Sequence, residues 1–215
     1  MTTTFSDIRR PIRSGIVLMD PILGTPQRVI VMQFNPDSLE RSLAPQAAGA
    51  EQQGDRTEAL RLKGPAVETW KLEVDIDSTD QLDVAAPDGI HPQLATLEML
   101  VHAPSSRIRA NQLLAAVGTL EIIPIEQPLT LLVWGSKRVL PVRLTELSIT
   151  ETAFDVDLNP VRATVSLGLR LLTSSDLPTG HRGAELFLAH LAQKERLAGT
   201  LAAGRLETLG LTGIQ

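Results

Sequence analysis

The residues whose types and spacing come closest to a chemical site are Asp155, Asp157 and Asn159, which follow one another like the first ligands of a calcium-binding loop. Such a loop also needs a glycine at its sixth position and a bidentate glutamate at its twelfth. Those positions hold Pro160 and Ser166. The ligand set is therefore incomplete, and the segment is interpreted as the polar tip of a turn that joins two strands.

Asp75 and Asp77 form a second carboxylate pair on one face of an alternating segment. Paired carboxylates serve as general acid and base when burial separates their pKa values. Lys71 and Glu73 lie on the same face of that segment, which indicates a solvated surface. We therefore expect a charged outer strand face here and no acid–base pair.

The remaining signatures of catalysis are incomplete or absent. Gly135-Ser136-Lys137 lacks the upstream glycine of a phosphate-binding loop, and the chain has no G-x-S-x-G or G-x-G-x-x-G run and no cysteine. The histidines follow neither of the zinc patterns H-x-x-x-H and H-E-x-x-H. The sequence thus predicts no enzyme, no cofactor and no metal site. The four histidines are His91, His102, His181 and His190.

Composition argues against further classes of function, namely nucleic-acid binding and membrane insertion. The 215 residues carry a net charge of −5, which argues against general nucleic-acid binding because that depends on basic surfaces. The basic cluster Arg9, Arg10 and Arg13 is interpreted as part of a solvated arm. The first residues lack the apolar region of a secretory signal, and no apolar run is long enough to span a bilayer, so no direct membrane insertion is expected. With two Trp, four Phe and no Tyr, the core must be aliphatic.

Alternating apolar residues predict that strands dominate the chain. In 68–77, Trp70, Leu72, Val74 and Ile76 share one face, and 162–172 is the most regular strand. Residues 137–150 follow a Gly135-Ser136 turn and form the second half of a hairpin, with a change of parity that indicates a bulge. The inward face of 162–172 is Ala163, Val165, Leu167, Leu169 and Leu171. Further strands are expected at 15–19, 28–34, 120–125 and 128–134, with 38–43 a strand or a turn of helix.

Three helical segments are expected. The first starts at Pro92, carries a stripe of Leu94, Leu97, Leu100 and Val101, and ends at Pro104. Residues 107–117 form a short helix or an irregular segment. The third helix spans 183–203, because Ala, Leu, Glu, Lys and Gln favour helix. Its expected apolar stripe and C-cap are Phe187, Leu191, Leu197, Leu201 and Gly204.

These elements predict an α+β, mainly β fold. We expect a flexible arm at 1–14, a β domain at 15–173 and a helical extension at 174–215. Residues 44–64 are small, polar and non-periodic. A loop of that length inside a compact domain is typically functional, so we expect it to order against a neighbouring molecule.

Four segments, in order, resemble the contractile injection system tube proteins. Gln33-Phe34-Asn35-Pro36 resembles an opening "FNP" motif, and 69–77 is similar to a central strand that ends in acidic residues. Leu132-Val133-Trp134-Gly135 resembles a "WG" turn, and Phe154 with 159–165 resembles a closing hairpin. The positions that carry the likeness are Phe34, Asn35, Pro36, Trp134, Gly135, Phe154, Pro160, Arg162 and Ala163.

The resemblance implies a tube-type antiparallel β-sandwich or barrel with a flanking helix, assembled as a hexameric ring. It also implies an adaptor that links the central spike or hub to the inner tube and contacts the baseplate wedge proteins. Such a protein is made in the bacterial cytoplasm and assembled into a phage-tail-like particle. Members of this type often carry a LysM-like module, whereas this chain has a helix near 183–203, so no LysM contact is carried over. The alternatives are the repeating inner-tube subunit and, from another class, a soluble β-barrel ligand-binding domain.

Overall fold

The computed structural model describes residues 14–20, 23–32, 39–47, 61–78, 88–118, 127–201 and 204. Within these ranges all strands belong to one antiparallel sheet, whose order is β2-β1-β5-β6-β7-β4-β3. The strands are β1 (Ser14–Met19), β2 (Pro26–Met32), β3 (Glu40–Ala44), β4 (Val67–Asp77), β5 (Thr130–Val133), β6 (Val139–Phe154) and β7 (Pro160–Leu171). The helices are α1 (His91–Glu98), α2 (Ser105–Ala116) and α3 (Arg182–Gly199). The predicted α+β, mainly β class is confirmed.

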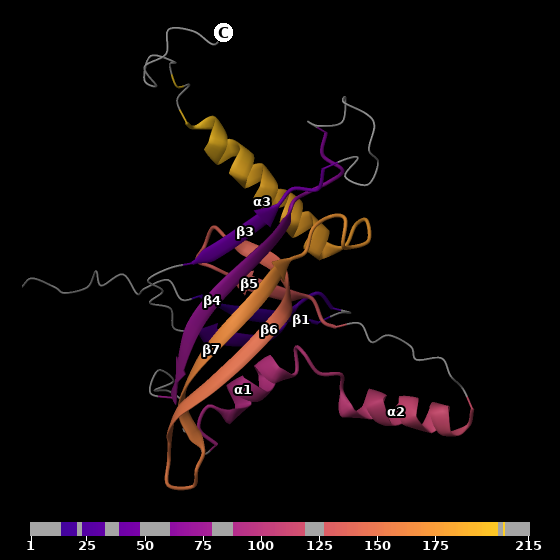
Figure 1. Ribbon diagram of the computed structural model, residues 1–215, viewed down its shortest axis with the longest axis vertical. Helices are drawn as coiled ribbons and strands as arrows, with labels where there is room; N and C mark the ends of the chain where they lie inside the picture. The colour runs from indigo at the N-terminus through magenta and orange to yellow at the C-terminus, as the bar shows by residue number, and fades with distance from the viewer. Residues whose placement is uncertain are drawn as a thin grey trace, which may run out of the picture.

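The sheet is strongly curled, as Figure 1 shows. Residues of β2, one edge strand, approach β4, which lies next to the opposite edge. The apolar faces of all strands except β3 therefore surround one core, which is aliphatic except for Trp70 and Phe187. Burial of this surface is the main favourable contribution to folding. Among the most buried side chains are Ile16, Trp70, Leu132, Val165 and Leu169.

The strands β4 and β7 lie side by side and show why alternation predicts them well. Their register places Trp70 opposite Leu169 and Val74 opposite Val165, all of them buried. Because side chains of a strand alternate between its two faces, the polar residues between them face outward. Lys71, Glu73 and Asp75 are exposed, as the sequence predicts.

The strands β5 and β6 form the expected hairpin. The Trp134 N–H donates to the Arg138 carbonyl at 2.7 Å, and Gly135 adopts a positive φ of 71° within the turn. The predicted bulge is also present, as a register shift between Leu144 and Glu146. Gly168 lies opposite this bulge, and a Cβ there would come within 2.9 Å of the Glu146 Cβ, so the close strand approach requires glycine.

The first two helices differ in part from the prediction. α1 buries Leu94 and Leu97 but ends at Glu98, six residues before Pro104, and Val101 is exposed. Pro104 is instead the N-cap of α2, with ψ of 135°, so it starts the second helix rather than ending the first. A proline fits this position because its extended backbone and missing N–H suit the entrance to a helix. The segment that the sequence leaves undecided is therefore helical.

The third helix begins at Arg182, one residue before the predicted start at 183. The His181 side chain caps it, because its Nδ1 accepts from the Gly183 N–H at 3.1 Å. The helix packs Ala184, Phe187 and His190 against the sheet beside β6.

The predicted apolar stripe of this helix is confirmed only at Phe187, which is buried, and the predicted C-cap is wrong. Leu191, Leu197 and Leu201 are exposed, although Lys194 between them still bonds to the sheet. Only the C-terminal end of α3 extends past the sheet (Figure 1). The helix is capped at Thr200, whose hydroxyl donates to the Leu197 carbonyl at 2.7 Å, so Gly204 is not the cap.

Some predicted features lie outside the described residues. They are most of the N-terminal arm, the strand expected at 120–125, the centre of the 44–64 loop, and Phe34, Asn35 and Pro36. The two ends of that loop are paired by a bridge between Ala47 and Leu62. Among the helices that the structure describes, none has both the length and the apolar character needed to cross a membrane.

Candidate subunit interface

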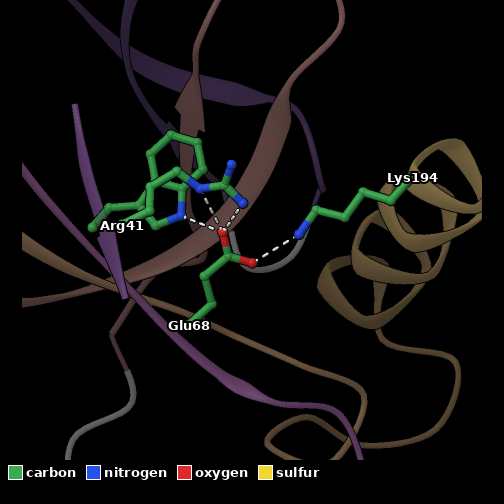
Figure 2. A network of polar contacts seen from close by, with 4 residues as sticks. Arg41, Glu68 and Lys194 are labelled. Carbon is green, nitrogen blue, oxygen red and sulfur yellow. Dashed lines mark hydrogen bonds and ion pairs between the residues drawn. The ribbon is translucent and has the colours of Figure 1, made fainter. Parts of the chain in front are cut away.

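A buried carboxylate joins the edge of the sheet to the C-terminal helix (Figure 2). The Glu68 side chain, on β4, is only 4% exposed and accepts from residues of three elements. Arg41 of β3 donates to its Oε1 at 3.0 and 2.6 Å, and Trp70 donates to the same oxygen at 2.7 Å. Lys194 of α3 donates to Oε2 at 2.8 Å. We call these four residues the Glu68 cluster; it fixes the helix to the sheet.

The electrostatics of this cluster follow from its geometry. Burial raises the pKa of Glu68, but the hydrogen bonds from Lys194, Arg41 and Trp70 outweigh it and hold the pKa below its ordinary value. A buried carboxylate is tolerated when its lone pairs are filled by charged donors, and both cations stay about one-third exposed, at 30% for Arg41 and 35% for Lys194. Glu68 therefore stays ionised at neutral pH.

Trp134 extends this cluster toward the β5–β6 turn. The rings of Trp70 and Trp134 meet edge to face, with centroids 6.3 Å apart and an angle of 77°. The Arg41 guanidinium lies 4.9 Å from the Trp70 ring centroid, within reach of a cation–π interaction. Trp134 and Gly135, two positions of the sequence motif, thus hold the turn beside the Glu68 cluster.

His190 lies in the same region of α3 and has an unusual environment. The residue is 9% exposed, and neither ring nitrogen has a hydrogen-bond partner among the described residues. Burial lowers the pKa of His190, as do the nearby positive charges of Lys194, Arg41 and Arg138, while Glu68 opposes them. The imidazole is therefore neutral at pH 7, and acid disfavours the docked helix.

The tip of the β6–β7 hairpin is a closed polar turn, as the sequence predicts. Asp155 Oδ1 accepts from the backbone N–H groups of Asp157 and Asn159 at 2.9 and 2.8 Å, and its Oδ2 accepts from the Asn159 side chain at 3.0 Å. These bonds hold the pKa of Asp155 below its ordinary value, and the bond from the Asn159 side chain has the largest effect. Leu158 is held at a φ of 63°, which non-glycine residues rarely adopt.

The other motif positions of this hairpin have structural contacts. The carbonyl of Pro160 accepts from the Ile90 N–H at 2.8 Å, which fixes the start of α1. Arg162 donates to Asp77 at 2.7 Å across the β4–β7 ladder, and Ala163 is fully buried beneath it.

The two strand carboxylates that resemble an acid–base pair each have their own partner. Asp77 is held by Arg162, and Asp75 accepts from the Thr164 hydroxyl at 2.8 Å. The described histidines are also spread over the fold, since His91 begins α1 while His181 and His190 belong to the α3 region. Among the residues that the structure describes, no group of three His, Cys, Asp or Glu residues could hold a metal ion.

Strand edges and apolar side chains are exposed at the ends and edges of the fold. Within the described ranges, β2 and β3 are the two edge strands, each hydrogen-bonded to one neighbour only. All five residues of β3 are exposed, as are Val29 and Val31 of β2. Exposed edges of this kind favour pairing with another chain. Further exposed apolar side chains belong to the hairpin tip and to α2 with its C-cap residue, among them Phe154, Val156, Leu158, Leu113, Leu114 and Val117.

The Glu68 cluster was not predicted from the sequence. One signal was available for Glu68, since it shares the parity of Trp70, Leu72 and Val74 and therefore points into the core. Nothing in the sequence pairs it with Lys194, which lies 126 residues away.

Comparison with known proteins identifies a matching family model. The family model described as contractile injection system tube protein matches residues 23–177, well over half of the chain. No curated protein matches. A solved chain from a structure titled the tail of an empty GTA particle, with C6 symmetry, is 11% identical and aligns with 74% of this chain and 90% of its own, at a TM-score of 0.29. So low a TM-score carries no weight for the arrangement of subunits.

Proposed function

Because the chain belongs to the contractile injection system tube protein family, we propose that it is a ring-forming structural subunit of such an apparatus, acting as the adaptor between the central spike or hub and the inner tube. Its role is mechanical, and no residue is assigned to catalysis. The ring is a hexamer, and its partners are further copies of the chain, the spike or hub, the inner tube and the baseplate wedge proteins. The particle is phage-tail-like and is assembled in the bacterial cytoplasm.

The observation that carries this proposal is the sheet with two open edges. In the described residues, the outer sides of β2 and β3 have no strand neighbour. If β2 of one copy lies beside β3 of the next, the backbone donors and acceptors of both edges are satisfied. Such a head-to-tail contact closes into a ring when the rotation between copies is an integral fraction of a turn. The curled sheets then form one continuous wall around a channel.

In this proposal each segment of the chain has its own role in the ring. Residues 15–173 build the ring wall, with 44–64 contacting the next copy or ring. The extension 174–215 faces the baseplate. Support for this last role comes from α3, which Lys194 fixes to the sheet through the Glu68 cluster while Leu191 and Leu197 stay exposed. A helix that is already fixed to the sheet presents its apolar side chains to a partner without first having to order them.

The repeating inner-tube subunit is the second candidate, because the family description names a tube protein and applies to both roles. The two roles differ in how far assembly proceeds. Purified protein at high concentration, imaged by negative-stain electron microscopy, should show single rings for an adaptor and long cylinders for a repeating subunit. A monodisperse monomer that assembles into neither would refute both.

The open-edge mechanism has its own test. Val29→Lys places a charge on the β2 edge, a substitution that typically blocks edge pairing, and should abolish the rings. The matched control is Leu188→Lys, which changes a comparably exposed leucine on α3 and should leave the rings intact. Rings that persist in the Val29→Lys protein would rule out β2 as a pairing edge.

A further inference from the structure

The helix α2 is exposed on all sides, and no residue in it is buried. Figure 1 shows that it projects away from the curled sheet. It nevertheless carries Ala110, Leu113 and Leu114, which with the C-cap residue Val117 follow the i, i+3, i+4 and i+7 spacing of one helix face and form an apolar stripe. Leu113 and Val117 are 70% and 78% exposed. A helix with this pattern normally packs its stripe against another element.

The charge of α2 indicates what covers this stripe. Residues 99–118 contain Arg107 and Arg109 and no acidic residue. Both arginines are exposed. The stripe is therefore apolar with a basic flank, and a matching surface must be apolar with an acidic flank.

The tip of the β6–β7 hairpin has those properties. Phe154, Val156 and Leu158 are 50%, 98% and 77% exposed. Residues 144–161 contain Glu146, Glu151, Asp155 and Asp157 and no lysine or arginine. The bonds to Asp155 hold the backbone of the tip in one conformation, so the tip loses little entropy when it binds.

We propose that the hairpin tip of one copy packs against the α2 stripe of a second copy. Within one chain the two surfaces do not cover each other, because Val156 and Val117 are both largely exposed. Every copy carries both surfaces, so the contact is head-to-tail and repeats from copy to copy. This inference rests on the proposed ring function and adds to it a second contact, distinct from the sheet edges, together with the element that receives the tip.

The absence of native cysteine makes the contact directly testable. Chains with Val156→Cys and one affinity tag are mixed with chains that carry Val117→Cys and a different tag, then treated with a short thiol–thiol cross-linker after assembly. A product containing both tags is expected. The control replaces Val117→Cys with Leu188→Cys, an exposed site on α3 that is assigned to no contact between copies, and should give no such product.

Charge exchange tests the specificity of the contact. Glu151→Lys with Asp157→Lys on the tip copy, or Arg107→Glu with Arg109→Glu on the helix copy, should each lower the yield of the mixed product at least tenfold, since like charges then face each other. Mixing the two altered chains should restore the yield. Yields that do not change in either single exchange would overturn the proposed charge matching.

A final variant removes apolar surface while preserving the turn. Leu158→Asn suits the positive φ of 63°, so the hairpin keeps its shape, and the mixed cross-link should weaken. Rings that form normally without any tip-to-helix cross-link would refute this contact and leave the ring proposal standing. Chains that do not associate at all would refute both.

Discussion

Replacing Glu68 with glutamine should loosen the C-terminal helix from the sheet. The side chain keeps its volume, but one carboxylate oxygen becomes an amide that cannot accept. If the remaining oxygen faces Arg41 and Trp70, the amide faces Lys194 and the 2.8 Å bond from Lys194 Nζ is lost. The contacts with Arg41 become neutral-acceptor bonds at the same time.

The size of the effect follows from these contacts. A hydrogen bond to a charged group contributes about 1.5–3 kcal/mol, against about 0.5–1.5 kcal/mol for a neutral one. The loss is reduced because Arg41 and Lys194 are 30% and 35% exposed and regain water. We therefore expect Glu68→Gln to lower the free energy of unfolding by about 2–3 kcal/mol, below the ~3–5 kcal/mol for breaking a fully buried pair. For a chain of this size that corresponds to a fall in Tm of roughly 4–12 °C.

The assay is urea and thermal denaturation of both proteins at pH 7 and one protein concentration, because assembly itself shifts apparent stability. The control is Glu73→Gln, which makes the same chemical change on the exposed face of the same strand. It should alter the free energy of unfolding by less than about 0.5 kcal/mol.

Acid provides an internal check. The pKa of Glu68 is lower in the folded than in the unfolded protein, so its contribution is complete above the unfolded value of about 4.3 and is lost as pH falls through the folded pKa. The difference between wild type and Glu68→Gln should thus be constant near neutrality and shrink below about pH 4. Equal stability of the two proteins at pH 7, or an equal loss in Glu73→Gln, would show that the cluster does not hold the helix.

Three further outcomes are expected. Gly89→Ala should lower the free energy of unfolding by more than about 2 kcal/mol, because φ is +57° and the new Cβ would lie 2.2 Å from the Pro160 carbonyl oxygen. Gly180→Ala, where φ is +79° but no atom lies within 4 Å of the new Cβ, should lower it by only about 1 kcal/mol. The pKa of His190 is lowered by folding, so its contribution is complete above about pH 6.5 and is lost below it; His190→Leu should remove that part of the pH–stability curve. Leu158→Asn should leave stability unchanged or raise it by up to about 1 kcal/mol in thermal denaturation, and a marked loss would contradict the strain assigned to this turn.

Strands were predictable wherever one face is apolar and the other polar. The alternation in β4 and β7 identifies both strands and their buried faces, and the parity change in β6 locates its bulge within a few residues. This works because the two-residue period of a strand is a local property of the backbone. Trp134-Gly135 likewise marks a turn, since glycine adopts the positive φ that the hairpin needs.

Helix faces were less predictable. The leucines of α3 at 191 and 197 satisfy a helical spacing, yet both are exposed, although Lys194 between them bonds to the sheet. The helix instead buries Ala184, Phe187 and His190, a short and partly polar face. Spacing shows which residues share a side of a helix, but not how much of the helix has something to pack against.

Local patterns along the chain were enough to predict a mainly β protein with an aliphatic core, an Asp-rich turn and the ordered motifs of its family. The folded structure was needed to show that β2 and β3 become the edges, that α2 stays exposed, and that Glu68 joins Lys194 across 126 residues. The physical reason is that periodicity is set by neighbours along the chain. Sheet order and buried charge pairs depend on which distant segments come together. The apolar–polar alternation of a strand does not identify its neighbour, because every strand of the sheet would show the same alternation.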